Sequence, residues 1–421
     1  MNPAATKAQL SLDARITAER LADALAVPPP PEPDGDRSPA SPRWRGQSLS
    51  KGAAGIAVLH AALADAGLAG WNRAQGWLSC AVREELSSGP GAGLWYGAPA
   101  VAFALTTAAR PGTCQRAQAG LGTAVRRLTR TYLAAAQARM AAAARPARRE
   151  YDLVNGLTGL GAYLLRQQPD SALMPEVLTY LVALTTPVAA ADPAGTDAPG
   201  WWTGDIPAGK PPERFHGGHA DLGMAHGIGG PLALLALSMR HGVTVNGHAD
   251  AIRRICAWLD SWRQDSPAGP WWPERVTRQE LATGRCAQPG PRRPSWCYGT
   301  PGLARAQQLA GLALADHDRQ RAAEHAMAGC LTDPGQLAQL TDPALCHGWA
   351  GVLLTAWHAA ADAGTPDITS QLPMLTSALL QHASGCGHPG LIEGSAGIAL
   401  TLHTITSPPP GTGWEACLLI S

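Results

Sequence analysis

The sequence is poor in several features that would assign it to a class at once. Its 421 residues include only two phenylalanines, and charged residues make up 15 % with a net charge of +1. A dedicated nucleic-acid-binding protein has a strong basic excess, which disfavours that class here. No stretch reaches the roughly 18 uncharged apolar residues of a membrane span. Residues 1–27 also lack the apolar core of roughly 7–15 residues found in a signal peptide.

The cysteines do not form an evident disulfide framework. There are nine of them, an odd number, and they are spread from Cys80 to Cys417. In a chain without an export signal they indicate free thiols in a reducing compartment. We therefore expect a cytoplasmic protein.

The chain does have an internal repeat, a Gly-x-x-Gly pair that leads an apolar segment. Ala- and Leu-rich segments favour helix, and each copy has room for two helices and a loop. We therefore expect an all-α fold of seven helical hairpins, which can stack as an open solenoid or close into a ring. Ala100 replaces the second glycine of the second copy, and the seven pairs are Gly52/Gly55, Gly97/Ala100, Gly156/Gly159, Gly227/Gly230, Gly299/Gly302, Gly348/Gly351 and Gly394/Gly397.

Two regions differ from the repeat. Residues 1–47 are predicted to form a helix over residues 7–26 and a proline-rich linker, Val27–Pro42, that pack on the repeat domain. Residues 48–421 are predicted to form that domain. The longer gaps between the middle glycine pairs indicate insertions at about 192–221 and 262–292.

The residue before the first glycine is polar in every copy, although an apolar helix follows it. If the copies are equivalent, these side chains gather on one rim of the fold, and a purely structural repeat needs no such row. We therefore expect the functional site there. The row is Lys51, Tyr96, Asn155, His226, Tyr298, His347 and Glu393.

Two cysteines extend this row. One position earlier, the fifth and sixth copies have Cys297 and Cys346, and His347 follows the latter. Two thiolates and an imidazole are ligands that zinc prefers, and three protein ligands with an open position are typical of a catalytic zinc. We predict one zinc ion per chain, bound by these three residues. The alternative is that they are small buried residues of inner helices. With two anionic ligands, the ion would keep an incoming thiol as an electron-rich thiolate.

At these residues the chain resembles the lanthionine synthetase C family, the cyclases of lanthipeptide antibiotic biosynthesis. The likeness covers residues 48–405 and rests on the glycine pairs together with "SWCYGTPG", "CHG" and "AHGIGG". It implies an α/α toroid of seven inner and seven outer helices and a free-standing cyclase, since no dehydratase or kinase region precedes the toroid. It also implies that zinc is bound by Cys297, Cys346 and His347.

The resemblance implies further site residues, with other readings left open. His226 matches the family's proposed acid/base histidine, although it can instead be a buried histidine capped by backbone. Asp152 matches the family's aspartate and would orient His226, pair with Arg293 or cap a helix. Arg293 would hold an enolate oxygen or Asp152, or lie on the surface. Tyr298 would donate a hydrogen bond to the enolate or simply pack.

The implied reaction is intramolecular. A cysteine of a dehydrated precursor peptide, with leader and core segments, adds to a dehydroalanine or dehydrobutyrine and forms a thioether ring. A dehydratase is the implied partner, and a biosynthetic complex at the membrane is a further possible location. The alternatives are a family member that only binds zinc, thiols or a partner, and a prenyltransferase-type zinc alkyltransferase. The latter normally has six hairpins and an Asp-Cys-His zinc site.

Overall fold

The computed structural model describes residues 3–30, 46–108, 113–167, 171–188, 198–407 and 411–421. Most of the predicted linker Val27–Pro42 and the start of the first insertion lie outside these residues. The described part is mostly helical, which confirms the all-α prediction. None of its helices combines the length and the apolar character needed to cross a membrane.

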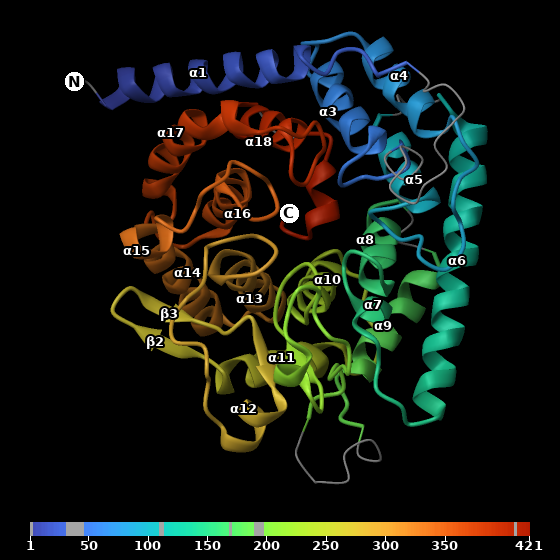
Figure 1. Ribbon diagram of the computed structural model, residues 1–421, viewed down its shortest axis with the longest axis vertical. Helices are drawn as coiled ribbons and strands as arrows, with labels where there is room; N and C mark the ends of the chain where they lie inside the picture. Colours follow the sequence, from blue (N-terminus) through green and yellow to red (C-terminus); the bar gives the residue numbers. More distant parts are fainter. Residues whose placement is uncertain (1–2, 31–45, 109–112, 168–170, 189–197, 408–410) are drawn as a thin grey trace.

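Seven inner helices form a closed ring, each starting just after the first glycine of a repeat (Figure 1). Every inner helix packs on the next, and the last packs on the first, so the repeat closes instead of forming a solenoid. These helices are mostly apolar and buried on nearly every face, with a few buried polar residues such as Arg305 in α13. They are α3 (Ala53–Asp65), α5 (Ala98–Ala108), α8 (Leu157–Gln167), α10 (Gly229–Arg240), α13 (Thr300–Leu314), α16 (Trp349–Asp362) and α18 (Ser395–Thr406).

The outer helices are amphipathic and cover the ring. In α11 the buried residues follow a helical period, from Ala251 and Ile252 to Ile255 and Leu259, with charged residues between them. Six outer helices follow their inner partners in the chain. They are α4 (Trp71–Ala81), α6 (Gln115–Ala141), α9 (Leu173–Leu184), α11 (His248–Ser261), α14 (His317–Thr332) and α17 (Leu372–His382).

The seventh outer helix comes from the other end of the chain. The helix predicted over residues 7–26 is present as α1 (Pro3–Asp23), and it packs on α17 and α18 (Figure 1). Its contact face is a buried stripe of three alanines and one leucine: Ala14, Ala18, Leu21 and Ala22. This helix thus completes the outer ring next to the last inner helix. The division at residue 47 remains a prediction.

The glycine pairs are explained by close packing at the start of each inner helix. A side chain at Gly351 would place its Cβ 2.0 Å from the carbonyl oxygen of Leu345, in the loop that leads into the helix. In other repeats the carbonyl oxygen of the residue equivalent to Leu345 also lies against the second glycine. At Gly397, for example, this residue is Leu391. The close approach expected from the sequence is therefore made mainly by the loop that precedes each inner helix.

The two insertions fold against each other. The first contains η2 (Pro212–Phe215) and β1 (His219–Asp221), and the second contains β4 (Arg275–Thr277). Strands β1 and β4 pair antiparallel, with Asp221 opposite Arg275. The remaining short elements are β2 (Gln264–Ser266), β3 (Gly269–Trp271), α7 (Arg148–Tyr151), α12 (Arg278–Thr283), α15 (Pro334–Leu337), η3 (Thr369–Gln371), η4 (Ala383–Gly385) and η5 (Trp414–Leu418).

The C-terminal segment lies inside the ring (Figure 1). Trp414, 1 % exposed, donates a hydrogen bond from its indole N–H to Thr404 near the end of α18 (3.1 Å). Further along, the carbonyl oxygen of Leu418 accepts a hydrogen bond from the Trp296 indole (3.0 Å), and that of Ile420 accepts one from Arg305 (2.9 Å). The ring therefore encloses a packed core and not an open pore.

Candidate active site

Backbone hydrogen bonds align the loops that precede neighbouring inner helices. The residue two before the first glycine donates its N–H to the carbonyl of the equivalent residue in the next repeat. The bonds run from Ala225 to Cys297 (3.3 Å), from Cys297 to Cys346 (3.2 Å) and from Cys346 to Ile392 (2.8 Å). Residues that share a position in the repeat are thus direct neighbours in space.

This alignment brings the three predicted metal ligands together. The ligand atoms of Cys297, Cys346 and His347 lie within 4.8 Å of one another, close enough to share one ion. Cys297 is buried, whereas Cys346 and His347 are partly exposed. A set of two cysteines and one histidine matches the chemistry of a zinc site with an open position.

The electrostatics of this cluster favour a thiolate. Hydrogen bonds from Cys346 and then His347 lower the pKa of Cys297 to about 5, against the opposing effect of burial. The same contact with Cys297 raises the pKa of Cys346, so the pair shares one proton. The pKa of His347 is raised by its hydrogen bond to Cys297. These shifts favour a thiolate at Cys297.

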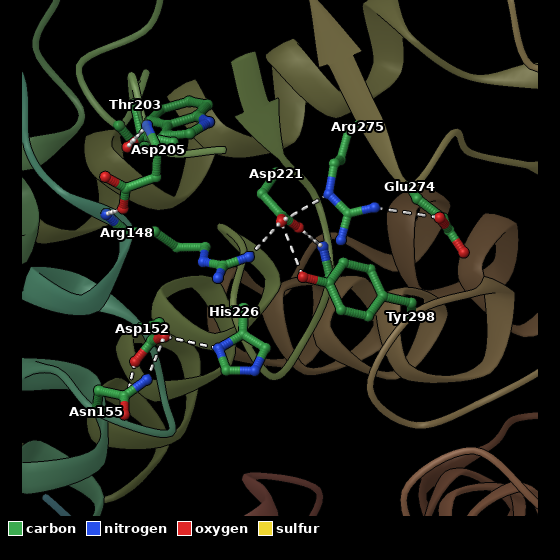
Figure 2. A network of polar contacts seen from close by, with 12 residues as sticks. Arg148, Asp152, Asn155, Thr203, Asp205, Asp221, His226, Glu274, Arg275 and Tyr298 are labelled. Atoms are coloured by element: carbon green, nitrogen blue, oxygen red, sulfur yellow. Dashed lines mark hydrogen bonds and ion pairs between the residues drawn. The ribbon is translucent and has the colours of Figure 1, made fainter. Parts of the chain in front are cut away.

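A second group lies on the neighbouring repeats. The Nδ1–H of His226 donates to the Oδ2 of Asp152 at 2.7 Å (Figure 2). The Asp152 carboxylate is fully buried and also accepts the backbone N–H groups of Asn155 (2.6 Å) and Gly156 (3.0 Å). Of the roles expected for Asp152, the contact that orients His226 is present, whereas the backbone N–H groups that it accepts lie in the loop before α8 and not in the helix. The His226 side chain is 30 % exposed.

Tyr298 lies on the other side of His226, and its hydroxyl is already engaged. It donates to the Oδ2 of Asp221 at 2.8 Å, and its ring centroid lies 6.5 Å from that of His226 (Figure 2). Burial, and then the charge of Asp221, raise the pKa of Tyr298 well above its usual value. Tyr298 therefore stays protonated and donates to Asp221.

Asp221 is the centre of a buried ion-pair network. Besides Tyr298, it accepts a hydrogen bond from Arg275 (3.2 Å) and lies 3.6 Å from the guanidinium of Arg148 (Figure 2). The guanidinium of Arg275 also lies over the Tyr298 ring, 4.7 Å from its centroid. Because Asp221 and Arg275 face each other across β1 and β4, the paired insertions hold Tyr298 in place.

Arg293 lies with the metal cluster. It contacts Asp342 at 3.6 Å, and the same oxygen of Asp342 lies 3.7 Å from the Nε2 of His347. Its side chain is 37 % exposed. The expected pairing of Arg293 with Asp152 does not occur among the contacts of the described residues.

Sequence reasoning missed Asp221 and Asp342, although the repeat contained a signal for both. Each stands six residues before the first glycine of its repeat, as Arg293 does in the repeat between them. In all three repeats the carbonyl oxygen of this residue lies against that glycine. In these three repeats a second polar residue therefore lies behind the rim row, six residues before the first glycine.

Known proteins share this architecture. A family model described as lanthionine synthetase C-like protein matches residues 43–419. The nisin biosynthesis protein NisC of Lactococcus lactis subsp. lactis is 22 % identical over 284 residues, which span 64 % of this chain and 64 % of that protein, just under two thirds. The structure of a nisin cyclase matches 90 % of this chain and 93 % of its own, with a TM-score of 0.76 and 19 % identity. The match to a solved structure supports the α/α toroid predicted from the sequence, and the family model shows that the chain belongs to the lanthionine synthetase C-like family.

Proposed function

We propose that the protein is a zinc-dependent lanthipeptide cyclase. It would join a cysteine thiol of a dehydrated precursor peptide to a dehydroalanine or dehydrobutyrine of the same peptide. The observation that carries the proposal is the placement of two groups on one rim, the Cys297–Cys346–His347 cluster and the His226–Asp152 pair. The first suits binding of a thiol, and the second suits movement of a proton.

Cys297, Cys346 and His347 would hold the zinc ion. The donor set fits the metal, and the lowered pKa of Cys297 supplies one anionic ligand. When bound, zinc would stabilise a substrate thiol as a thiolate at neutral pH. Asp342, whose carboxylate lies 3.7 Å from the Nε2 of His347, would help to orient that ring.

His226 would move the proton. Since Asp152 is held as an acceptor by two backbone N–H groups, His226 keeps its proton on Nδ1 and leaves the lone pair of Nε2 free to accept. That nitrogen would take the thiol proton and later return one to the α-carbon of the product. The net reaction is an isomerisation, because the proton lost from sulfur is regained at carbon.

The other predicted catalytic residues would act on the enolate or its surroundings. Arg293, partly exposed beside the cluster, carries a positive charge that would stabilise an enolate oxygen. Tyr298 has its proton engaged by Asp221, so we propose that it forms a fixed wall of the site beside His226. The same proposal includes a peptide substrate and a partner dehydratase. It places the protein in the cytoplasm, at the periphery of a membrane-associated biosynthetic complex.

The test uses a synthetic peptide with one cysteine and one dehydroalanine separated by two residues. We expect about one zinc per wild-type chain, and loss of the free thiol of the peptide at unchanged mass. Cys346→Ala should lose the metal and the cyclisation. Cys256→Ala, at a buried cysteine of α11 remote from the rim, is the matched control and should keep both.

Two results would contradict the proposal. Metal-free wild-type protein, prepared with zinc present, would remove the zinc site. Zinc-loaded protein that binds the peptide thiol without accelerating cyclisation would instead favour the inactive binding protein that the sequence left open. The prenyltransferase alternative is disfavoured by the ring of seven inner helices and by a donor set with no aspartate.

A further inference from the structure

A cavity of about 460 Å³ lies beside the candidate metal cluster. Cys297, Ser295 and Tyr298 form the wall nearest the site. The opposite walls come from the two insertions, through Phe215 in the first and Glu274 in the second. The insertions thus enclose a space that the toroid alone would leave open.

The lining of this cavity is strongly basic. It includes a single acidic side chain, Glu274, against five cations. The whole chain has 33 basic and 32 acidic residues, so the excess is local and does not follow from composition. The cations are Lys210, Arg214, Arg275, Arg292 and Arg293.

Existing ion pairs account for only part of this charge. Arg275 is bound by Asp221 and by Glu274, and Arg293 contacts Asp342. The other three, Lys210, Arg214 and Arg292, are exposed, and no ion pair with an acidic side chain is found for them within the described residues. The guanidinium of Arg214 rests over the Phe215 ring, 5.8 Å from its centroid, which helps hold it at the cavity.

We propose that this cavity binds carboxylate side chains of the substrate peptide, aspartates or glutamates close to the reacting cysteine. The planar guanidinium groups of Arg214 and Arg292 suit two-point hydrogen bonding to a carboxylate. Since Cys297 lines the same cavity, a carboxylate bound there lies on the same peptide segment as a thiol at the metal cluster. The inference rests on the proposed function and names a feature of its substrate.

The test measures binding of four fluorescein-labelled peptides to the zinc-loaded chain by fluorescence anisotropy. The peptides combine cysteine or serine at one position with two flanking aspartates or two asparagines. For wild type at low salt we expect the aspartate peptides to bind about three- to tenfold more tightly, the range expected of a few partly exposed ion pairs. The preference should weaken as salt is added.

The double variant Arg214→Gln/Arg292→Gln should reduce this preference to less than about twofold. The matched control is Arg116→Gln/Arg130→Gln, which removes the same charge from exposed positions of α6 and should keep the preference. Equal binding of aspartate and asparagine peptides to wild type would overturn the proposal. So would a preference that survives in the double variant.

The cysteine and serine arms separate this inference from the proposed function. Aspartate preference without a difference between cysteine and serine would keep the carboxylate site and contradict thiol binding at the metal. Tighter binding of the cysteine peptides without any preference for aspartate would support the thiol site and overturn the carboxylate site. A fifth peptide, with its aspartates ten residues from the cysteine, should bind like the asparagine peptides, and tight binding by it would contradict the placement next to the reacting thiol.

Discussion

The two ends of the ring are built from different kinds of side chain. At the end where the inner helices start, polar groups from adjacent repeats meet: cysteine and histidine in one cluster, histidine and aspartate in another. Toward the end where the inner helices finish, the C-terminal segment packs the buried indole of Trp414 into the ring, bonded to Thr404 near the end of α18. The first end offers partly exposed reactive groups, and the second contributes buried apolar surface.

This difference suggests that chemistry and stability are largely separable in the molecule. Loss of a polar group at the rim removes little buried apolar area, whereas loss of a tail side chain leaves a cavity. Variants at the two ends should therefore fail in different assays.

The largest effect is expected at His226. His226→Asn should lower kcat for cyclisation by about 10²–10⁴-fold, the usual contribution of a positioned acid/base. Zinc content and thermal unfolding should stay near wild type, since the side chain is partly exposed and not a metal ligand. Asp152→Asn should lower kcat less while changing its pH profile. Single-turnover kinetics with a zinc assay on the same samples measures this, and joint loss of zinc and rate would break the separation.

At the other end, Trp414→Ala should lower the free energy of unfolding by about 3–5 kcal/mol, because it removes a buried indole and leaves a cavity. Folded protein should still bind zinc. The control Leu68→Ala, at a side chain 48 % exposed, should change stability by less than about 0.5 kcal/mol. Urea titration gives the stability, and zinc loss at low urea in the Trp414 variant would show that the tail supports the site directly.

Gly351→Ala tests whether the close packing of an inner helix also positions a metal ligand. The new Cβ would meet the Leu345 carbonyl at 2.0 Å, so the loop that carries Cys346 must move. We expect a loss of about 3 kcal/mol in stability, together with weaker zinc binding. Gly364→Ala, where a Cβ meets nothing within 4 Å, is the control and should be nearly neutral. A stable Gly351 variant with full zinc affinity would disprove the packing argument.

The smallest effect should come from Asp342→Asn. Because its carboxylate lies 3.7 Å from the Nε2 of His347, its loss should weaken zinc binding by about 10–100-fold with stability unchanged. Competition with a chromophoric chelator gives the dissociation constant. Asp333→Asn, an exchange of the same kind at the cap of a helix away from the rim, should leave zinc affinity unaltered.

The repeat made much of this arrangement predictable. Equivalent loops occupy equivalent places, so the position of Cys297 and Cys346 relative to their glycines was enough to place them side by side. The same argument could have found Asp221 and Asp342, had the position six residues before the glycine been compared. Closure of the ring was not predictable in this way, because the spacing of the glycine pairs does not determine the angle between neighbouring hairpins.

The structure of the two insertions could not be predicted from the repeat. Strands β1 and β4 pair across more than fifty residues of intervening sequence, and β4 lies outside the repeat, so no periodicity points from Asp221 to Arg275. Contacts between non-equivalent segments depend on side-chain packing that the spacing of motifs does not determine. The partner of Arg293 differs in this respect, because Asp342 holds the equivalent position in the next repeat.

The contact of α1 with α18 has a consequence for folding. These helices stand near opposite ends of the sequence, so the seam between them can form only after nearly the whole chain has been made. Contacts between distant segments cost loop entropy before they contribute stability, and they slow folding. During synthesis, the stripe on α1 and the side of α3 that contacts α18 stay uncovered until α18 has been made. We therefore expect the nascent chain to depend on chaperones longest at this seam, and the closed ring to unfold as one cooperative unit once it has formed.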